Sequence, residues 1–246
     1  MPFLGKHVVI TGGAGAIGLA MATEFVDQGA TVTLLDMRNP NEIRDLIADL
    51  RAEYRQVDVR DPDAVGEVVD RLAPIDVAIG NAGIYLGSSV LDISAADWRM
   101  QIDVNLTGVF FFAQAAARKM VKLGRPGAIL FTGSWAQEIP GPKGAAYGTS
   151  KAAVRMLARC MALELGPLGI RVNVVAPGMV NAGMAKRQIQ LDPEFARKAE
   201  KGIPLGKLQT AEQVAKASVF LCSEAAEAIT GVTLLVDGGA SLFKYE

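Results

Sequence analysis

Tyr147 and Lys151 are the residues of this 246-residue chain whose types and spacing first suggest chemistry. They stand four positions apart in the run AAYGTSK, so on a helix they would share one face, with about 5–6 Å between their Cβ atoms. The chain has a single histidine, His7, at the start of the first predicted strand, and we expect it to have no chemical role. The pair is therefore a candidate acid/base, although exposed tyrosine–lysine pairs are also common on helix surfaces.

A phenol can take the place of an imidazole only if its pKa falls. Free tyrosine has a pKa near 10, so proton abstraction at neutral pH needs a drop of ~3 units, or ~4 kcal/mol of phenolate stabilisation. A neighbouring ammonium in a partly dehydrated pocket can contribute much of this. Ser134, thirteen residues before Tyr147, follows a predicted strand at the edge where open parallel sheets bind ligands. Its hydroxyl could hydrogen-bond the reacting oxygen.

The elements that must position these residues alternate along the chain. Strands are predicted at 7–11, 31–36, 54–58, 76–80, 128–132, 171–176 and 233–237, and helices at 16–28, 61–72, 96–122, 148–166 and 211–223. This alternation predicts an α/β fold, a single-domain Rossmann-type doubly wound sheet of seven parallel strands with helices on both faces. We expect one domain over 1–246, with the long stretch 177–209 acting as a substrate lid.

A glycine-rich run, TGGAGAIG at 11–18, joins the first strand to the first helix. Glycines let the backbone approach a pyrophosphate, and a helix N-terminus offers free N–H groups to it. A tight turn without a ligand is the simpler alternative. The second strand ends in Asp36, whose carboxylate can accept bonds from both ribose hydroxyls and would repel the 2′-phosphate of NADP. We therefore predict NAD as cofactor, while Arg38 leaves NADP as an alternative.

Further motifs follow in order: Asp58-Val59, NAG at 81–83, VN at 104–105, GS at 133–134, YGTSK, APG at 176–178 and VDGG at 236–239. With these, the whole chain resembles the short-chain dehydrogenase/reductase family, closest to its NAD-dependent sugar and polyol dehydrogenases. The resemblance implies four catalytic residues, Asn105, Ser134, Tyr147 and Lys151. Lys151 would lower the tyrosine pKa and hold the nicotinamide ribose, and Asn105 would anchor a water of the proton relay.

The same resemblance implies the cofactor contacts. They are Gly12, Gly15, Ala16, Ile17, Gly18, Asp36, Asp58, Val59, Asn81, Ala82, Gly83, Tyr147, Lys151, Pro177, Gly178 and Val180. Three positions depart from the family pattern, which has glycine at 16, asparagine at 80 and threonine at 182, where this chain has Ala16, Gly80 and Ala182. None of the three is the predicted acid/base group, so activity remains the expectation.

The predicted substrate contacts mix polar and apolar side chains. They are Ser134, Gln137, Glu138, Tyr147, Asn181 and Met184. A polar pocket together with NAD favours oxidation of a sugar or polyol. The alternatives are a 3-oxoacyl (acyl carrier protein) or other ketone reductase, a dehydrogenase of steroid-like or small secondary alcohols, and a non-catalytic NAD-binding scaffold on the same fold.

Composition limits the partners. The 25 basic and 26 acidic residues nearly cancel, so we expect no nucleic acid and no membrane partner. No metal site is predicted, and Cys160 and Cys222 are interpreted as buried thiols in a reducing compartment. With no signal-peptide pattern at the N-terminus, we expect a cytoplasmic protein. The helices at 96–122 and 148–166 are apolar over more than one face, which favours a homotetramer over a thick monomer core.

Overall fold

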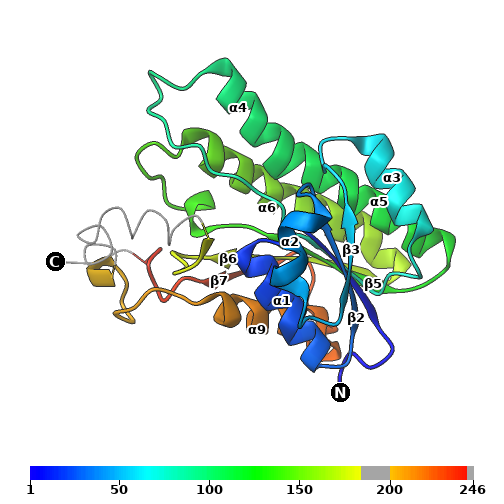
Figure 1. Cartoon of the computed structure of the whole chain (residues 1–246). Coiled ribbons are helices and arrows are strands. Elements are labelled where there is room, and N and C mark those ends of the chain that lie inside the picture. Colours follow the sequence, from blue (N-terminus) through cyan, green and yellow to red (C-terminus); the bar gives the residue numbers. More distant parts are fainter. Residues whose placement is uncertain (184–199, 243–246) are drawn as a thin grey trace.

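One parallel sheet forms the centre of the molecule (Figure 1). In the computed structural model, the described residues are 1–183 and 200–242. The strands run in the order β3-β2-β1-β4-β5-β6-β7. Their bounds are β1 His7–Thr11, β2 Thr31–Asp36, β3 Ala52–Gln56, β4 Val77–Gly80, β5 Gly127–Thr132, β6 Ile170–Pro177 and β7 Thr233–Val236. All neighbours pair in parallel, which confirms the predicted doubly wound sheet.

Helices cover both faces of this sheet. The α-helices are α1 Ala16–Asp27, α2 Pro40–Ile47, α3 Pro62–Arg71, α4 Ala95–Ile102, α5 Val109–Lys122, α6 Ala145–Leu165 and α9 Ala211–Cys222. Short helical turns are the π-helix Asp103–Gly108 and the 3-10 segments Trp135–Gln137, Gly166–Leu168 and Glu224–Ala226. Side chains of α1 and α9 join the core on one face, and those of α3, α5 and α6 join the core on the other.

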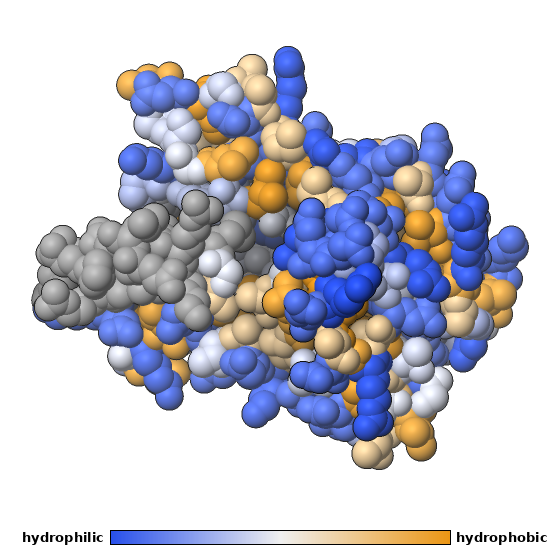
Figure 2. Space-filling model, viewed as in Figure 1, coloured by the Kyte–Doolittle hydropathy of each residue, from blue (hydrophilic) through white to orange (hydrophobic). Residues whose placement is uncertain are grey.

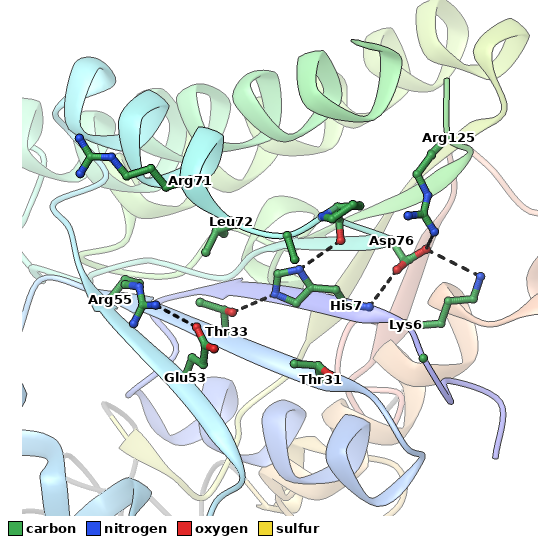
Figure 3. Close-up of a pocket in the computed structure, with 13 residues that line it drawn as sticks. Lys6, His7, Thr31, Thr33, Glu53, Arg55, Arg71, Leu72, Asp76 and Arg125 are labelled. Atoms are coloured by element: carbon green, nitrogen blue, oxygen red, sulfur yellow. Dashed lines mark hydrogen bonds and ion pairs between the residues drawn. The ribbon is translucent and has the colours of Figure 1, made fainter. Parts of the chain in front are cut away.

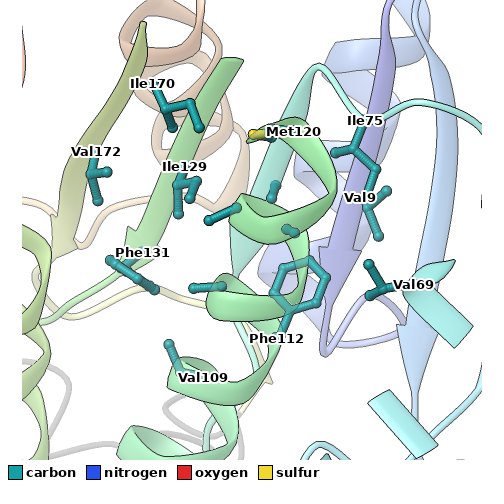
Figure 4. Packing of buried hydrophobic residues seen from close by; sticks show 14 of the residues in the cluster. Val9, Val69, Ile75, Val109, Phe112, Met120, Ile129, Phe131, Ile170 and Val172 are labelled. Atoms are coloured by element: carbon teal, nitrogen blue, oxygen red, sulfur yellow. The ribbon is translucent and has the colours of Figure 1, made fainter. Parts of the chain in front are cut away.

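The two cores follow from the side-chain alternation of the strands. On β1, Val9 belongs to the core under α3 and α5, while Val8 and Ile10 belong to the core under α1 and α9. Figure 4 shows the first core, with Phe112 of α5 among Val9, Val69 and other branched side chains. Five strands, β1, β2, β4, β5 and β6, are buried on both faces and therefore consist mostly of apolar residues, whereas the edge strand β3 is largely exposed.

Capping residues place the helix starts that position the site. The Asp61 side chain accepts bonds from the N–H groups of Asp63 and Ala64 at the start of α3. Thr210 and Gln213 form a reciprocal capping box at the start of α9. Asn39 caps α2 in the same way through Asn41, and that helix was missed.

Three sequence predictions need correction. The helix predicted over 96–122 is interrupted, because residues 103–108 widen into a π-helix between α4 and α5. The strand predicted at 54–58 is β3, Ala52–Gln56, so Asp58 lies beyond its end. Cys160 is exposed on α6, whereas Cys222 is buried as predicted and burial raises its pKa to about 12.

The exposed side of α6 is partly apolar. Met156 is 55% exposed and Leu163 80% exposed, with Cys160 between them one helical turn from each. No helix in the described ranges is both long and apolar enough to cross a bilayer.

Candidate active site

The carboxyl ends of β1, β4, β5 and β6 meet the first turns of α1 and α6. The space-filling view shows the surface hollowed between the side where α4 lies and the side where α1 and α2 lie (Figure 2). Every predicted catalytic residue comes from an element that ends or begins here, or from the π-helix beside it. This is the edge at which open α/β sheets bind ligands.

The glycine run turns the chain sharply from β1 into α1. Gly12 has φ +59°, and a Cβ atom there would lie 2.8 Å from the Cα atom of Ala82. A Cβ atom on Gly18 would lie 2.5 Å from the Gly12 carbonyl oxygen, so both positions need glycine. The N-cap of α1 is Gly15, which has no side chain to bond the first N–H groups. The loop therefore leaves a helix N-terminus open to an anion.

Asp36 stands beside this loop at the end of β2, as predicted. Its carboxylate accepts a hydrogen bond from the Ala14 N–H at 3.2 Å, which joins the second strand to the glycine loop. It also accepts bonds from the Arg38 backbone N–H and guanidinium, at 3.2–3.4 Å. Asp36 is 9% exposed, so this carboxylate is a fixed feature of the loop rather than a surface charge.

The cofactor contacts predicted at Asp58 and Asn81 continue along the same edge. The Asp58 carboxylate pairs with Arg60, and this pairing lowers the pKa of Asp58. The Asn81 amide donates a bond to the Gly12 carbonyl at 3.1 Å and accepts one from the Thr132 hydroxyl at 3.0 Å. Asn81 therefore ties the glycine loop to the end of β5, a bracing role beside its predicted contact with the cofactor.

Tyr147 and Ser134 come together across the cleft. Ser134 is buried two residues after β5, and its hydroxyl interacts with the Tyr147 phenol closely enough to lower the Tyr147 pKa. Burial raises the pKa of Tyr147, the bond with Ser134 opposes that rise, and nearby Tyr85 adds to it. The Tyr147 phenol is therefore neutral near pH 7 in this structure and lies close to Ser134. The predicted acidification of Tyr147 requires positive charge beyond what this state provides.

Lys151 is buried one turn after Tyr147 on α6. Its ammonium donates a 2.7 Å hydrogen bond to the Thr132 carbonyl, and Nζ lies 5.7 Å from the centroid of the Tyr147 ring. Burial lowers the Lys151 pKa to about 8. A Cβ atom at Gly83 would lie only 3.4 Å from Nζ, so the NAG turn passes close over the ammonium. The lysine is placed between the tyrosine and that turn.

Asn105 lies in the π-helix and is fully buried. Its amide oxygen accepts the Ile84 N–H at 2.8 Å, and its amide nitrogen donates to the Ile84 carbonyl at 2.9 Å and to the Ser150 hydroxyl at 3.2 Å. Ser150 in turn donates to the Tyr147 carbonyl at 2.7 Å. Asn105 thus holds the chain after β4 against the helix that carries the tyrosine. Its predicted role in a proton relay stays a prediction.

The cofactor contacts predicted at Pro177, Gly178 and Val180 lie at the end of β6 and just after it. The Gly178 N–H donates to Val236 of β7, and Val180 forms a parallel bridge with Gln209. The Asn181 N–H donates to the Gln209 carbonyl at 2.8 Å, so the two ends of the expected lid are joined. Ala182 follows in this segment, and Asn181 is exposed beside it. Met184, a predicted substrate contact, lies outside the described residues, as does the rest of the lid from 185 to 199.

The remaining predicted substrate contacts are Gln137 and Glu138. The Gln137 amide is buried against Gly133, and within the described chain neither its oxygen nor its nitrogen has a hydrogen-bond partner. Glu138 is exposed, and its carboxylate pairs with Arg155 of α6 at 2.6 Å. The Gln137 amide therefore has an unused donor and acceptor within the described chain, whereas Glu138 already has a partner.

The sequence motifs did not identify Tyr85, Thr11 and Thr132 as residues of the site. Tyr85 packs edge-on against Tyr147, with 5.5 Å between ring centroids, and its hydroxyl donates to the Lys143 carbonyl. The Thr11 hydroxyl accepts the N–H groups of Asn81 and Ala82. Thr11 is the last residue of β1 and Thr132 the last residue of β5, and this place at strand ends could have identified both. Tyr85 lies in a loop that offers no such cue.

The packing around Gly80 explains why this chain has glycine where the family pattern has asparagine. A Cβ atom there would lie 2.9 Å from both the Phe131 ring and the Val109 side chain. The large Phe131 of β5 thus fills the space that a side chain at position 80 would need.

His7 lies far from this chemistry, at the opposite end of β1. Its ring nitrogens lie 3.2 Å from the Pro74 carbonyl oxygen and 2.9 Å from the Thr33 hydroxyl. Figure 3 shows it in a pocket of about 440 Å³ whose floor is formed by the first residues of β1 and β2. Ion pairs link Arg55 with Glu53, and both Lys6 and Arg125 with Asp76. These bonds fit the predicted structural role for His7.

The site fits a dinucleotide on structural grounds. The glycine cradle and open α1 N-terminus suit a pyrophosphate, and Asp36 and Asp58 stand where adenosine would lie. Lys151 and the segment from Pro177 to Val180 suit the nicotinamide end.

A family model described as "Enoyl-(Acyl carrier protein) reductase" matches residues 12–241. The chain belongs to the short-chain dehydrogenase/reductase family. As a member, it is an oxidoreductase that acts on CH–OH groups with a nicotinamide dinucleotide.

Individual family members are similar over nearly the whole chain. The 3beta-hydroxysteroid dehydrogenase 1 of Eggerthella lenta is 36% identical, with 97% of this chain and 95% of the relative covered. The 2,3-dihydro-2,3-dihydroxybenzoate dehydrogenase of Bacillus subtilis is also 36% identical, with 97% of each covered. A solved gluconate 5-dehydrogenase from Burkholderia cenocepacia, in complex with NADP and tartrate, superimposes with a TM-score of 0.92 at 31% identity, covering 98% of this chain and 97% of that one.

Proposed function

We propose that this family member oxidises a secondary alcohol to a ketone, or a sugar hemiacetal to a lactone, with Tyr147 as the acid/base. The observation that carries the proposal is the grouping of Ser134, Tyr147 and Lys151 at one end of the cleft. A bound nicotinamide would take the hydride from the carbinol carbon. The alcohol proton would pass to the Tyr147 oxygen, while Ser134 holds the reacting oxygen by a hydrogen bond.

Positive charge must favour the phenolate for this step. Lys151 is close enough to contribute, and an oxidised nicotinamide adds a second charge when bound. Because burial alone raises the Tyr147 pKa, we propose that acid/base function develops only in the complex with the oxidised cofactor.

We favour NAD over NADP as the cofactor. Asp36 is buried, is held by the Ala14 N–H, and carries a negative charge at the place where a 2′-phosphate would lie. The Arg38 side chain offsets this charge in part, so NADP is the alternative.

For the substrate we propose a sugar or polyol. The buried Gln137 amide offers both a donor and an acceptor without a partner in the described chain, which suits neighbouring hydroxyl groups. The gluconate 5-dehydrogenase shares the fold at 31% identity, which supports the same class.

A steroid-like or other cyclic alcohol is the second candidate. Tyr85 packs against Tyr147, and further apolar side chains are exposed along its loop and after the 3-10 segment at 135–137, namely Leu86, Val90, Leu91 and Ile139. Both relatives at 36% identity carry names of enzymes for cyclic alcohols, which favours this class as well.

A substrate panel tests the function. Sugars, polyols, dihydrodiols, hydroxysteroids and small secondary alcohols would be mixed with the protein and NAD or NADP, and absorbance of the reduced cofactor followed. We expect reduction of NAD with at least one polyol or sugar. Turnover of hydroxysteroids alone would select the second candidate, and silence with every compound despite cofactor binding would select a non-catalytic scaffold.

A further inference from the structure

Two buried amides hold the loop that follows β4. The Gln101 oxygen accepts the Leu86 N–H at 3.0 Å, and the Gln101 nitrogen donates to the Leu86 carbonyl at 3.2 Å. Asn105 makes the same reciprocal pair of bonds with Ile84. The two amides stand four positions apart and bond alternate residues of the loop, as a neighbouring strand would do. Side chains thus hold the loop at 84–88 as if it were an edge strand.

The residue between the two bonded positions is Tyr85, which faces the predicted acid/base. Its ring packs edge-on against that of Tyr147, with 5.5 Å between centroids, and its hydroxyl donates to the Lys143 carbonyl at 3.3 Å. The Ser88 N–H donates to the same carbonyl, also at 3.3 Å. Lys143 has φ +60°, a left-handed conformation that is uncommon and costly for residues other than glycine. The loop is therefore bonded on one side by Gln101 and on the other by this strained turn.

Hydrogen bonds rather than burial fix the loop. Tyr85 and Leu86 are 38% and 39% exposed, and Gly87 has no side chain, so this part of the loop buries little apolar surface of its own. Gln101, in contrast, is only 1% exposed. If Gln101 could not bond it, the backbone of Leu86 would be able to bond water instead, because that residue lies at the surface. Loss of the Gln101 amide should therefore let the loop move outward.

We propose that Gln101 is a positioning residue for the reaction, which keeps the Tyr85 ring against Tyr147 by holding Leu86. Its amide bonds the loop, so its effect on the phenol passes through Tyr85. A ring fixed in this place limits where the Tyr147 phenol can lie, and proton transfer depends on that position. This inference rests on the proposed acid/base role of Tyr147 and adds a supporting residue to it.

A double-mutant cycle with Tyr85 tests this connection. Gln101→Met keeps the length of the side chain and removes both bonds to Leu86. With NAD and the best substrate of the panel, we expect kcat/KM to fall about 3- to 10-fold, similar to the loss expected for Tyr85→Ala, while Kd for NADH stays within about two-fold of wild type. In the Tyr85→Ala background, Gln101→Met should lower kcat/KM by less than about two-fold more, because the ring that Gln101 positions is already gone.

Asn173→Leu is the matched control. Asn173 on β6 is also a buried amide with a reciprocal pair of bonds, since it donates to the Ile229 carbonyl at 2.9 Å and accepts the Val232 N–H at 3.1 Å. Those bonds hold the chain just before β7, at the end of the sheet away from Tyr147. The control should lose stability in urea as Gln101→Met does, but keep kcat/KM within about two-fold of wild type under conditions where it is folded.

A second variant keeps one of the two bonds. Gln101→Glu retains the shape of the side chain and an acceptor for the Leu86 N–H, but an ionised carboxylate cannot donate to the Leu86 carbonyl. Its kcat/KM should lie between those of wild type and Gln101→Met, and it takes the place of Gln101→Met in the cycle if the methionine variant does not fold.

Two results would overturn the positioning role while leaving the enzyme reading intact. One is wild-type kcat/KM in the Gln101 variant, and the other is a double variant whose loss equals the product of the two single losses. A wild-type protein that binds NADH and turns over no compound of the panel would instead overturn the proposed function, and this inference with it.

Discussion

Nζ of Lys151 lies 5.7 Å from the centroid of the Tyr147 ring and donates its 2.7 Å hydrogen bond to the Thr132 carbonyl, not to the phenol. The ammonium is buried without a carboxylate partner in the described chain, and its pKa is lowered to about 8. Burial of this charge without a counter-ion is electrostatically unfavourable, and a cofactor hydroxyl or a phenolate beside the ammonium would reduce that cost.

The buried ammonium predicts how stability depends on pH. The folded-state pKa of about 8 lies below the ordinary value of 10.5, so below pH 8 the cost of burying the charge is fully present. Between pH 8 and 10.5 the unfolded chain binds more protons than the folded chain, and the free energy of unfolding rises with pH. Lys151→Met should therefore be more stable than wild type at pH 7, by up to about 3 kcal/mol.

Urea unfolding at pH 7, 8, 9 and 10 without cofactor checks this. The difference between the variant and wild type should shrink as the pH rises. The exposed Lys122→Met serves as control and should show no such trend. A Lys151→Met protein that is less stable than wild type at pH 7 would show that the charge is compensated in the fold.

Asn105 predicts a structural effect distinct from catalysis. Asn105→Ala would leave the N–H and carbonyl of Ile84 without their buried partners and would remove the bond to Ser150. We expect a loss of about 2–4 kcal/mol in the free energy of unfolding, measured by urea titration. Asn41→Ala, at an exposed helix start, provides a control of the same chemistry. A loss below 1 kcal/mol would mean that water replaces the Asn105 bonds.

Tyr85 should affect the substrate step without affecting dinucleotide binding. Its ring packs edge-on against Tyr147, a contact worth about 0.5–1.5 kcal/mol. Tyr85→Ala should lower kcat/KM by about 3- to 10-fold, since the catalytic ring loses a wall, while the Kd for NADH stays the same. Tyr85→Phe keeps the ring and should stay near wild type. An equal loss in both variants would shift the role from the ring to the hydroxyl bonded to Lys143.

The exposed apolar side of α6 predicts self-association. Met156 and Leu163 are more than half exposed on the helix that carries Tyr147. In a homotetramer, as proposed from the sequence, a symmetry mate would cover them. Sedimentation equilibrium should give a mass above that of one chain, and Leu163→Asp should lower it. A wild-type mass equal to one chain would exclude the tetramer.

The sequence predicted most of the fold because buried parallel strands leave a strong signal. Apolar runs such as HVVIT and TVTLLD match β1 and β2 residue for residue. The π-helix at Asp103–Gly108 was missed because its sequence, DVNLTG, contains no proline and no pattern that distinguishes a π-helix from the α-helices on either side. The prediction that Cys160 is buried failed because one face of α6 is apolar without being covered by its own chain.

The site was predictable as a set of residues but not as a set of contacts. Motif order identified Ser134, Tyr147 and Lys151, and the structure brings them together. The pairing of Asp36 with Arg38 depends on side-chain rotamers and on Tyr54 from a third segment, which no local pattern encodes. The pairing of Glu138 with Arg155 of α6 is likewise not encoded by any local sequence pattern.

The central claim is that the Tyr147 phenol exchanges the proton of the substrate alcohol. The most direct test compares Tyr147→Phe with wild type in two measurements, kcat on the best substrate of the panel and Kd for NADH. We predict that kcat falls by at least about 10²-fold while NADH still binds within a few-fold of wild type, because only the proton-transfer group is lost. A variant that binds NADH normally and keeps more than a few per cent of wild-type kcat would contradict the account.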